Sequence, residues 1–323
     1  MRAAFFERQG EADQVIRVAE VETPEPGPGE VRVKLRYSGV NPTDWKSRSG
    51  LTPGRIDQYQ IPHHDGSGDI DMVGPGVDPA LVGQRVWVWL AAAGRRWGTA
   101  AEWTVVPSAQ AVRLPDGASY ELGASLGVPA MTAHRCLLAD GPVDGRAVLV
   151  AGGAGAVGHF AIELAKHLGA RVATTVSGAE KAELSAAPSA DLVVNYRAEG
   201  ALEQLRAFHL PFDRILEVNL PANLSWDLAL AGPQTSIVAY AATGQDPVLP
   251  LRACMNSNST LRFVLLYGVP RVALEEAAAA ITGALSAGAL SELPLHRFSL
   301  ADCAAAQDFV QAGAVGKVVL EIA

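Results

Sequence analysis

The chain has 323 residues, of which 49% are hydrophobic and 19% are charged, and its formal net charge is −8 at pH 7. This length and composition predict a soluble globular protein with two domains. The acidic balance argues against nucleic-acid binding, and the sequence suggests neither a signal peptide nor a membrane-spanning stretch.

The three cysteines, Cys136, Cys254 and Cys303, lie far apart in the sequence. Their odd number argues against a disulfide framework and favours a reducing, cytoplasmic location. Because no C-x-x-C pair is present, a structural zinc knuckle is not expected.

The first third of the chain has the pattern of short strands. The stretch 30–40 alternates apolar and polar residues, and further strands are predicted at 84–90 and 100–107. A Pro/Gly turn cluster precedes the first of them. Several short strands separated by turns predict a compact, barrel-like domain.

From about residue 119 the pattern changes to helix, and from 147 strands alternate with helices. Alternating apolar strands and helices predict a parallel sheet covered on both faces, an α/β fold. Strands are predicted at 147–152, 171–177, 191–196, 212–219, 235–241, 261–267 and 317–323, and helices at 119–139, 156–169, 179–187, 272–288 and near 301–312.

A G-x-G-x-x-G motif lies between an apolar strand and an amphipathic helix, at Gly153, Gly155 and Gly158. Glycines at these positions let the backbone turn tightly and approach a pyrophosphate, which the N–H groups at the start of the helix would face. The same loop includes Ala156 and Val157. The alternative is a tight turn that binds nothing, and the strand–turn–helix context disfavours it.

Ser177 ends the next strand, where an NAD-binding unit carries an acid for the adenosine ribose. A serine hydroxyl can donate to a 2′-phosphate, and Lys181 adds positive charge. Tyr196 ends the third strand and is a further candidate contact. The sequence therefore predicts NADPH as the cofactor. Glu180 and Glu183 weaken the argument, since Lys181 can instead be a solvated helix residue.

The chain resembles the medium-chain dehydrogenase/reductase superfamily, in its zinc-independent quinone oxidoreductase (zeta-crystallin-like) branch. The resemblance runs along the whole sequence. It is carried by "PGPGEVRVKLRYSGVNPTDWKSRSG" (26–50), "IPHHDGSGDIDMVGPGV" (61–77), "GGAGAVGHFAIELAKHLGARV" (152–172) and "GKVVLEI" (316–322).

This resemblance implies a GroES-like β-barrel substrate domain at 1–122, a Rossmann domain with a doubly wound parallel sheet at 123–265, and a C-terminal segment at 266–323 that completes the first domain. Substrate is expected in the cleft between the domains. Relatives pair through the last strand of the Rossmann sheet, which implies a homodimer through 260–267.

Zinc alcohol dehydrogenases belong to the same superfamily, and their catalytic zinc is held by a Cys, a His and a second Cys. These positions fall at Asn41, at His64 and near Val128. Because only one of three donors remains, no metal site is expected. His64 is kept as a candidate substrate contact, with a locally hydrogen-bonded loop imidazole as the alternative.

A reductase without a metal needs an acceptor that takes hydride unaided, such as a quinone or an α,β-unsaturated carbonyl compound. The resemblance implies NADPH-dependent reduction of these small molecules. Two alternatives stay open: an enoyl reductase of a biosynthetic pathway, and a non-catalytic NADPH-binding protein.

The resemblance also implies roles for single residues. Asn41 would contact the nicotinamide riboside, and Thr132 would lie on a helix beside the cofactor. Lys46, on an expected short loop over 41–46, would stabilise charge on the substrate oxygen, or else face solvent. Asp44 would pair near Lys46 or cap the turn.

Three further candidates lie at or near strand ends. Asn219 and Tyr240 follow successive strands on the expected cofactor side of the sheet. Tyr267 is a candidate substrate contact, with packing at a hinge as the alternative.

Overall fold

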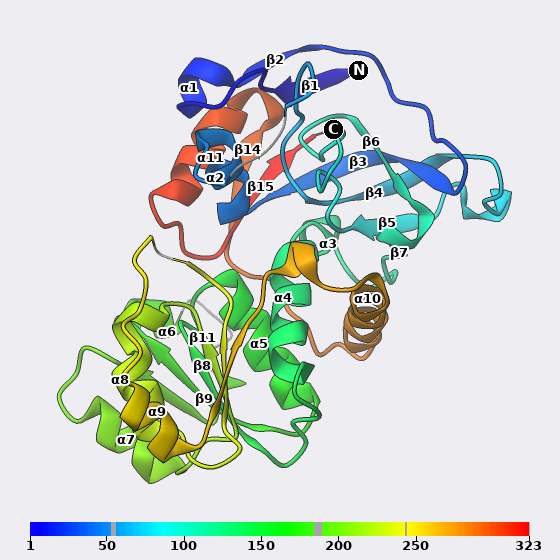
Figure 1. The fold of residues 1–323 in the computed structure, drawn as a ribbon. Helices are drawn as coiled ribbons and strands as arrows, with labels where there is room; N and C mark the ends of the chain where they lie inside the picture. The colour runs from blue at the N-terminus through cyan, green and yellow to red at the C-terminus, as the bar shows by residue number, and fades with distance from the viewer. Residues whose placement is uncertain (53–55, 184–188, 243, 323) are drawn as a thin grey trace. The chain divides into compact units, whose positions relative to one another are not determined.

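The structure is a computed structural model that describes residues 1–52, 56–183, 189–242 and 244–322 (Figure 1). The chain forms two compact units. The first unit comprises residues 1–128, 278–286 and 294–323, and the second unit comprises residues 129–277 and 287–293. In the described ranges, no helix is long and apolar enough to cross a membrane.

The first unit is built on a seven-stranded sheet, in which all neighbours are antiparallel except the β14–β15 pair. The order is β14-β15-β3-β4-β5-β7, and β6 also pairs with β3. The strands are β3 (Glu30–Val40), β4 (Asp65–Val73), β5 (Arg85–Val88), β6 (Trp103–Pro107), β7 (Ala111–Arg113), β14 (Leu295–Ser299) and β15 (Lys317–Glu321). A separate pair is formed by β1 (Arg2–Phe5) and β2 (Arg17–Glu20).

The alternation in β3 has a direct structural cause. Val31, Val33 and Leu35 are fully buried on one face, while the residues between them are more exposed. The strands predicted at 30–40, 84–90 and 100–107 correspond to β3, β5 and β6. β4 was not predicted, because its first residues are Asp, Gly and Ser rather than an apolar alternation.

The predicted loop over 41–46 is wrong, since these residues begin helix α2 (Pro42–Ser49). Asn41 is its N-cap, Pro42 is the first helical residue, and Asp44 completes a capping box with Asn41. The remaining helices that contribute to this unit are α1 (Ala12–Val15), α3 (Tyr120–Gly123), the start of α4 (Gly127–Leu138), the end of α10 (Arg271–Ser286) and α11 (Cys303–Gln311), with single 3₁₀ turns η1 (Pro79–Leu81), η2 (Ser108–Gln110) and η5 (Leu300–Asp302).

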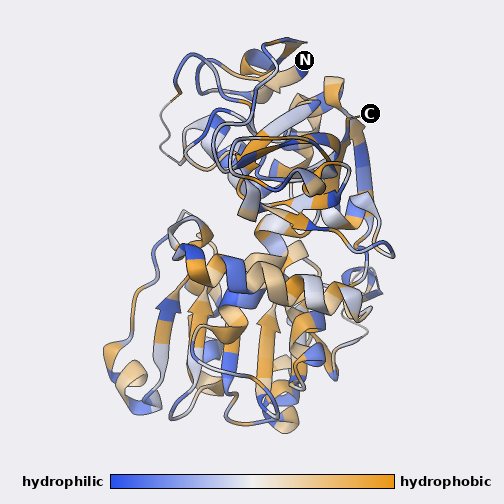
Figure 2. Cartoon of the chain, turned by 90° about the vertical axis from the view of Figure 1, so that its right-hand side faces the viewer, coloured by the Kyte–Doolittle hydropathy of each residue, from blue (hydrophilic) through white to orange (hydrophobic). Residues whose placement is uncertain are grey.

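The second unit confirms the doubly wound parallel sheet. Its six strands are all parallel and follow the order β10-β9-β8-β11-β12-β13, so the winding direction reverses between β8 and β11. They are mostly hydrophobic, as Figure 2 shows. The strands are β8 (Ala147–Ala151), β9 (Arg171–Val176), β10 (Leu192–Asn195), β11 (Arg214–Glu217), β12 (Ser236–Ala239) and β13 (Thr260–Phe263).

Helices cover both faces of this sheet, because right-handed crossovers in opposite directions place their helices on opposite sides. One face packs against α7 and α8 through Leu205, Leu220 and Leu224, and α5 packs against β8 and β9. The helices are α5 (Ala156–His167), α6 (Ala179–Glu183), α7 (Ala201–Phe208), α8 (Leu220–Leu230) and α9 (Leu251–Ser257), with a 3₁₀ turn η4 (Leu266–Gly268).

Of two predicted elements, one ends earlier than expected, and the last residues of the other lie outside the described ranges. The strand predicted at 261–267 ends at Phe263, and the chain continues into η4. The helix predicted at 179–187 is present as α6 up to Glu183, and its remaining residues lie outside the described residues.

Candidate active site

The glycine loop of the second unit turns the chain from β8 into α5. Gly152 has a φ of +75°, a conformation that favours glycine. The N–H groups of Gly152 and Gly153 both donate to the carbonyl oxygen of Thr175 at 3.1 Å. These bonds hold the loop against β9, so that α5 begins directly at the carboxyl edge of the sheet.

The three motif glycines differ in how much space surrounds them. A Cβ at Gly158 would overlap the carbonyl oxygen of Gly152, and a Cβ at Gly153 would overlap the Thr174 hydroxyl. A Cβ at Gly155 would meet only the Gly152 carbonyl oxygen, at 3.5 Å, and Gly155 is exposed. The surface beside the first turn of α5 is therefore open. The unsatisfied N–H groups of that turn fit a pyrophosphate.

The predicted adenosine-end residues gather at the same edge. Asn195 pairs with Val176 in the parallel register of β10 and β9, and the Tyr196 N–H donates to the Val176 carbonyl at 3.1 Å. Ser177 and Tyr196 are thus neighbours, and Lys181 follows on α6. No acid follows β9 at this point.

Sequence reasoning missed Arg197. Its guanidinium lies 5.8 Å from the centre of the Tyr196 ring, next to the same strand end. The basic residue directly after Tyr196 was the available signal. It adds a second cation to the end of the sheet where Lys181 lies.

Further along the edge, Glu217 is the last residue of β11 and is 1% exposed. Its Oε1 accepts the backbone N–H of Asn219 and, at 3.0 Å, Nδ2 of Asn223. The N–H of Tyr240 donates to the Glu217 carbonyl at 3.2 Å. Asn219 and Tyr240, both predicted, therefore meet around an acid that the sequence analysis missed.

Two further predicted residues of the second unit, Tyr240 and Thr132, have uncharged side chains. Burial raises the pKa of the Tyr240 hydroxyl, so this side chain stays protonated. Thr132 is buried on α4, within the stretch 119–139 that was predicted to be helical, and its contact with the cofactor stays a prediction.

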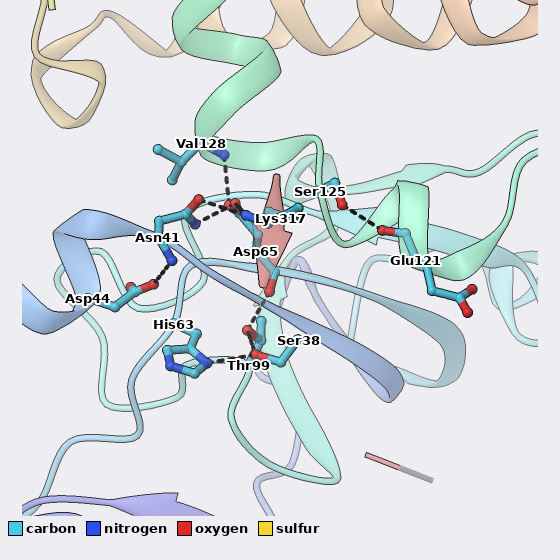
Figure 3. Close-up of polar contacts among 10 residues, drawn as sticks. All are labelled: Ser38, Asn41, Asp44, His63, Asp65, Thr99, Glu121, Ser125, Val128 and Lys317. Carbon is cyan, nitrogen blue, oxygen red and sulfur yellow. Dashed lines mark hydrogen bonds and ion pairs between the residues drawn. The ribbon is translucent and has the colours of Figure 1, made fainter. Parts of the chain in front are cut away.

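The first unit contains a buried polar cluster, which we call the Asp65 cluster: Asn41, Asp44, Asp65, the backbone N–H of Val128, and Lys317 (Figure 3). Asp65 Oδ2 accepts Asn41 Nδ2 at 2.6 Å, and Asp65 Oδ1 accepts the Val128 N–H at 2.7 Å. Lys317 Nζ lies 2.7 Å from Asn41 Oδ1 and 3.4 Å from Asp65 Oδ2.

Charges in the Asp65 cluster are balanced by one ion pair. Burial raises the pKa of Asp65 and lowers that of Lys317, and their mutual attraction opposes both shifts. Asp65 also accepts two N–H groups, which stabilise its charged form. We therefore assign Asp65 as a carboxylate and Lys317 as an ammonium. Burial raises the pKa of Asp44 well above its usual range, and its Oδ2 accepts the Asn41 N–H at 2.7 Å, so Asp44 acts as a helix cap.

A hydrogen-bonded chain extends from this cluster through His63. Gln307 Nε2 lies 3.2 Å from His63 Nε2, which must then accept, so Nδ1 carries the proton and donates to Ser38 Oγ at 2.9 Å. Ser38 lies 2.8 Å from the Thr99 hydroxyl, which donates to the Asp65 carbonyl at 2.5 Å. Burial lowers the pKa of His63 to about 3, so the ring is neutral.

Comparison with known proteins finds similar families for both the N-terminal and the nucleotide-binding part of the chain. Residues 27–116 match the family model of the alcohol dehydrogenase GroES-like domain, and residues 156–282 match that of zinc-binding dehydrogenases. Human quinone oxidoreductase is 26% identical, over 99% of this chain and 97% of that protein. A mycobacterial protein solved in complex with NADPH is 30% identical, with full coverage of both chains and a TM-score of 0.86.

The chain belongs to the medium-chain dehydrogenase/reductase superfamily, in its quinone oxidoreductase branch. The GroES-like and Rossmann domain types are thereby confirmed. It is an oxidoreductase with a nicotinamide-cofactor domain and a small-molecule substrate. A solved NAD-dependent alcohol dehydrogenase is also similar, at 25% identity, full coverage of both chains and a TM-score of 0.91.

The family includes zinc enzymes, so the zinc-ligand positions matter. Asn41 is bonded to Asp65 and Lys317, and Val128 contributes a backbone N–H rather than a donor side chain. His64 is buried, and burial lowers its pKa to about 4. Within the described ranges, no group of three or more His, Cys, Asp or Glu side chains is arranged to hold a metal ion. The donor set does not fit zinc, and Lys317 supplies the local positive charge.

The remaining predicted residues lie in different units. Lys46 is half-buried on α2, with its ammonium 5.8 Å from the centre of the Trp45 ring. Tyr267 is half-buried in η4 of the second unit. His64 directly precedes β4 in the first unit.

Proposed function

We propose that this protein is an NADPH-dependent reductase that transfers hydride to a quinone or an α,β-unsaturated carbonyl compound without zinc. The observation that carries the proposal is the Asp65 cluster. It has the Asn41 amide and the Val128 backbone N–H at two of the three positions where zinc relatives carry metal ligands, and the Lys317 ammonium is bonded to that amide. The dinucleotide loop is intact in the same chain.

NADPH is the proposed cofactor, and when bound it supplies the hydride. Gly153, Gly155, Ala156, Val157 and Gly158 form the loop that would hold its pyrophosphate. Ser177, Lys181 and Tyr196 would bind the 2′-phosphate, where a carboxylate would repel it. The mycobacterial relative in complex with NADPH supports this choice of cofactor.

Asn41 would hydrogen-bond to the nicotinamide riboside. Thr132 and Asn219 are further proposed cofactor contacts. An α,β-unsaturated carbonyl compound gains negative charge on oxygen as hydride reaches its β-carbon. The ammonium of Lys46 would stabilise that charge, and water would supply the proton.

His64 and Tyr267 are the proposed substrate contacts. Because burial keeps the pKa of His64 near 4, its imidazole would act as a neutral hydrogen-bond partner and not as a cation. Tyr267 offers a phenol and a ring face to a planar acceptor.

The proposed assembly is a homodimer through residues 260–267. β13 is the last strand of the sheet and pairs with β12 alone among the described strands. Phe263 is 70% exposed and Leu265 is 69% exposed beside this open edge. An exposed apolar strand edge favours pairing with another chain. The three free cysteines fit a cytoplasmic, reducing location.

The deciding experiment measures NADPH oxidation against a panel of quinones, 2-alkenals, cyclic enones and simple ketones, with elemental analysis of the same preparation. We expect turnover with at least one of the first three classes, no stoichiometric zinc, and no effect of a chelator. About one zinc per chain together with chelator-sensitive alcohol oxidation would overturn the proposal.

A further inference from the structure

Two acidic side chains of the second unit are buried against each other. Glu217 is 1% exposed at the end of β11, and Asp227 is 2% exposed on α8. Burying a carboxylate without partners is costly, so each of their oxygen atoms needs a hydrogen-bond donor.

The donors present do not satisfy all of these oxygens. Glu217 Oε1 accepts the N–H of Asn219 and Nδ2 of Asn223. Glu217 Oε2 and Asp227 Oδ2 have no donor among the described residues, although the two side chains are within hydrogen-bonding contact. Ionised carboxylates only accept, so one proton held between the two groups is the simplest partner for both oxygens.

The electrostatic environment of the two acids also favours one proton held between them. Burial, and then the nearby charge of Glu217, raise the pKa of Asp227 to about 9. Two carboxyl groups in one buried site cannot both ionise without a large penalty, so they share a proton.

The neighbouring groups bring no compensating charge. The Tyr240 hydroxyl faces Glu217 from the end of β12, and Cys136 of α4 faces Tyr240. Burial raises the pKa of both, that of Cys136 to about 12, so both are neutral. Arg214, on the same strand as Glu217, donates instead to the carbonyls of Cys136, Leu137 and Asp140.

The position of Glu217 at the carboxyl edge of the sheet, in contact with Asp227, indicates a role in ligand binding. Glu217 pairs with Ala239 in β12, and β11 lies next to β8, which carries the glycine loop. The winding of the sheet reverses between β8 and β11, and a ligand binds at such a switch point. Ser177 and Tyr196 mark the adenosine end on the other side of β8, so β11 and β12 lie toward the other half of a dinucleotide.

We propose that Glu217 and Asp227 share one proton, and that this proton holds Asn219 and the start of α8 in the geometry that binds the nicotinamide half of the cofactor. The inference rests on the proposed dinucleotide-binding function. Both acids are positioning residues, since they act through the N–H of Asn219 and the amide of Asn223. When the proton is lost, two buried carboxylates repel, and Glu217 cannot keep both bonds while one charge moves toward water.

The test compares dissociation constants of NADPH and of 2′,5′-ADP between pH 7 and 10, for the wild type and for Asp227→Asn. The amide keeps a donor for Glu217 but cannot ionise. In the wild type, the NADPH dissociation constant is expected to rise about tenfold from pH 8 to 10. Asp227→Asn should bind NADPH within twofold of the wild type at pH 7 and lose most of this rise.

The fragment separates positioning from general folding, because 2′,5′-ADP lacks the nicotinamide half. Its affinity should be the same for both proteins at every pH. Asp227→Ala, which leaves Glu217 charged and without its partner, should weaken NADPH at least tenfold at pH 7 and leave 2′,5′-ADP unchanged. If this variant does not fold, Asp227→Asn alone decides.

Identical pH profiles for NADPH in the wild type and Asp227→Asn would overturn the inference. Equal effects on NADPH and on 2′,5′-ADP would also overturn it, since they indicate a structural role. If the wild type prefers NADH, the proposed cofactor choice fails separately, and the same comparison is made with NADH and 5′-ADP.

Discussion

Lys317 Nζ lies 2.7 Å from Oδ1 of Asn41, although 276 residues separate the two in the sequence. The contact fixes the orientation of the Asn41 amide, because Oδ1 faces an ammonium while Nδ2 donates to Asp65. The last strand of the first unit thus determines which polar atoms Asn41 can offer to a ligand.

Replacing Lys317 with Met should lower the free energy of unfolding by about 3–5 kcal/mol, because Asp65 would remain as an uncompensated buried charge. Urea unfolding followed by tryptophan fluorescence measures this, since five of the six tryptophans lie in the first unit. The double variant Lys317→Met/Asp65→Asn is the control and should recover part of the loss. A loss below about 1 kcal/mol for Lys317→Met would contradict the assigned ion pair.

Replacing Ser177 with Asp should reverse the cofactor preference. The wild type is expected to bind NADPH at least about tenfold more tightly than NADH, or about 1.4 kcal/mol. A carboxylate would repel the 2′-phosphate and accept hydrogen bonds from a ribose hydroxyl. Fluorescence titration with both cofactors measures the ratio, with Ser177→Ala as the control that removes the hydroxyl without adding charge. Equal wild-type dissociation constants would refute the preference.

Replacing Lys46 with Ala should lower turnover on an enone by up to about 10²-fold, because the charge on the substrate oxygen loses its cation. NADPH affinity should stay within about twofold. Asn41→Ala should instead slow the reaction with every acceptor.

Lys34→Ala is a matched control for Lys46→Ala, since the Lys34 ammonium also lies 5.8 Å from a tryptophan ring, that of Trp103. It should leave turnover unchanged. Wild-type rates of Lys46→Ala with both quinones and enones would make Lys46 a surface residue without a catalytic role.

Acid should destabilise the protein through its buried histidines. Burial lowers the pKa of His63 to about 3 and that of His64 to about 4, against 6.5 in the unfolded chain. Below pH 6.5 the unfolded chain therefore binds protons that the folded protein does not, and stability falls as the pH falls. Each histidine contributes a loss of about 2 kcal/mol between pH 7 and 5.

His64→Gln removes one of these two contributions and should reduce the pH dependence of the urea midpoint. Parallel wild-type and variant curves between pH 7 and 5 would show that His64 titrates normally in the folded protein.

Light scattering at micromolar concentration should give the mass of a dimer. Phe263→Asp would place a charge on the open edge of β13 and should shift the protein toward monomer. Leu51→Asp is a matched control, because Leu51 is 68% exposed in the first unit and Phe263 is 70% exposed. A wild-type monomer would contradict the proposed interface.

Local patterns in the sequence were enough to predict several features. The glycine loop, its flanking strand and helix, and the alternation of β3 each depend on neighbouring residues, so their spacing carries the information. The helix α2 was also readable, since "NPTD" places Asn41 and Asp44 at the N-cap and N3 positions of a capping box. The predicted loop missed this local signal.

Only the tertiary structure determined the partners of the buried acids. Asp65, Asn41 and Lys317 are distant in sequence, and each belongs to a residue type that usually lies at the protein surface. Glu217 and Asp227 likewise resemble solvated acids on a strand and a helix. Their pKa values depend on burial and on which groups face them, and these are set by how strands and helices pack. No local pattern contains that information.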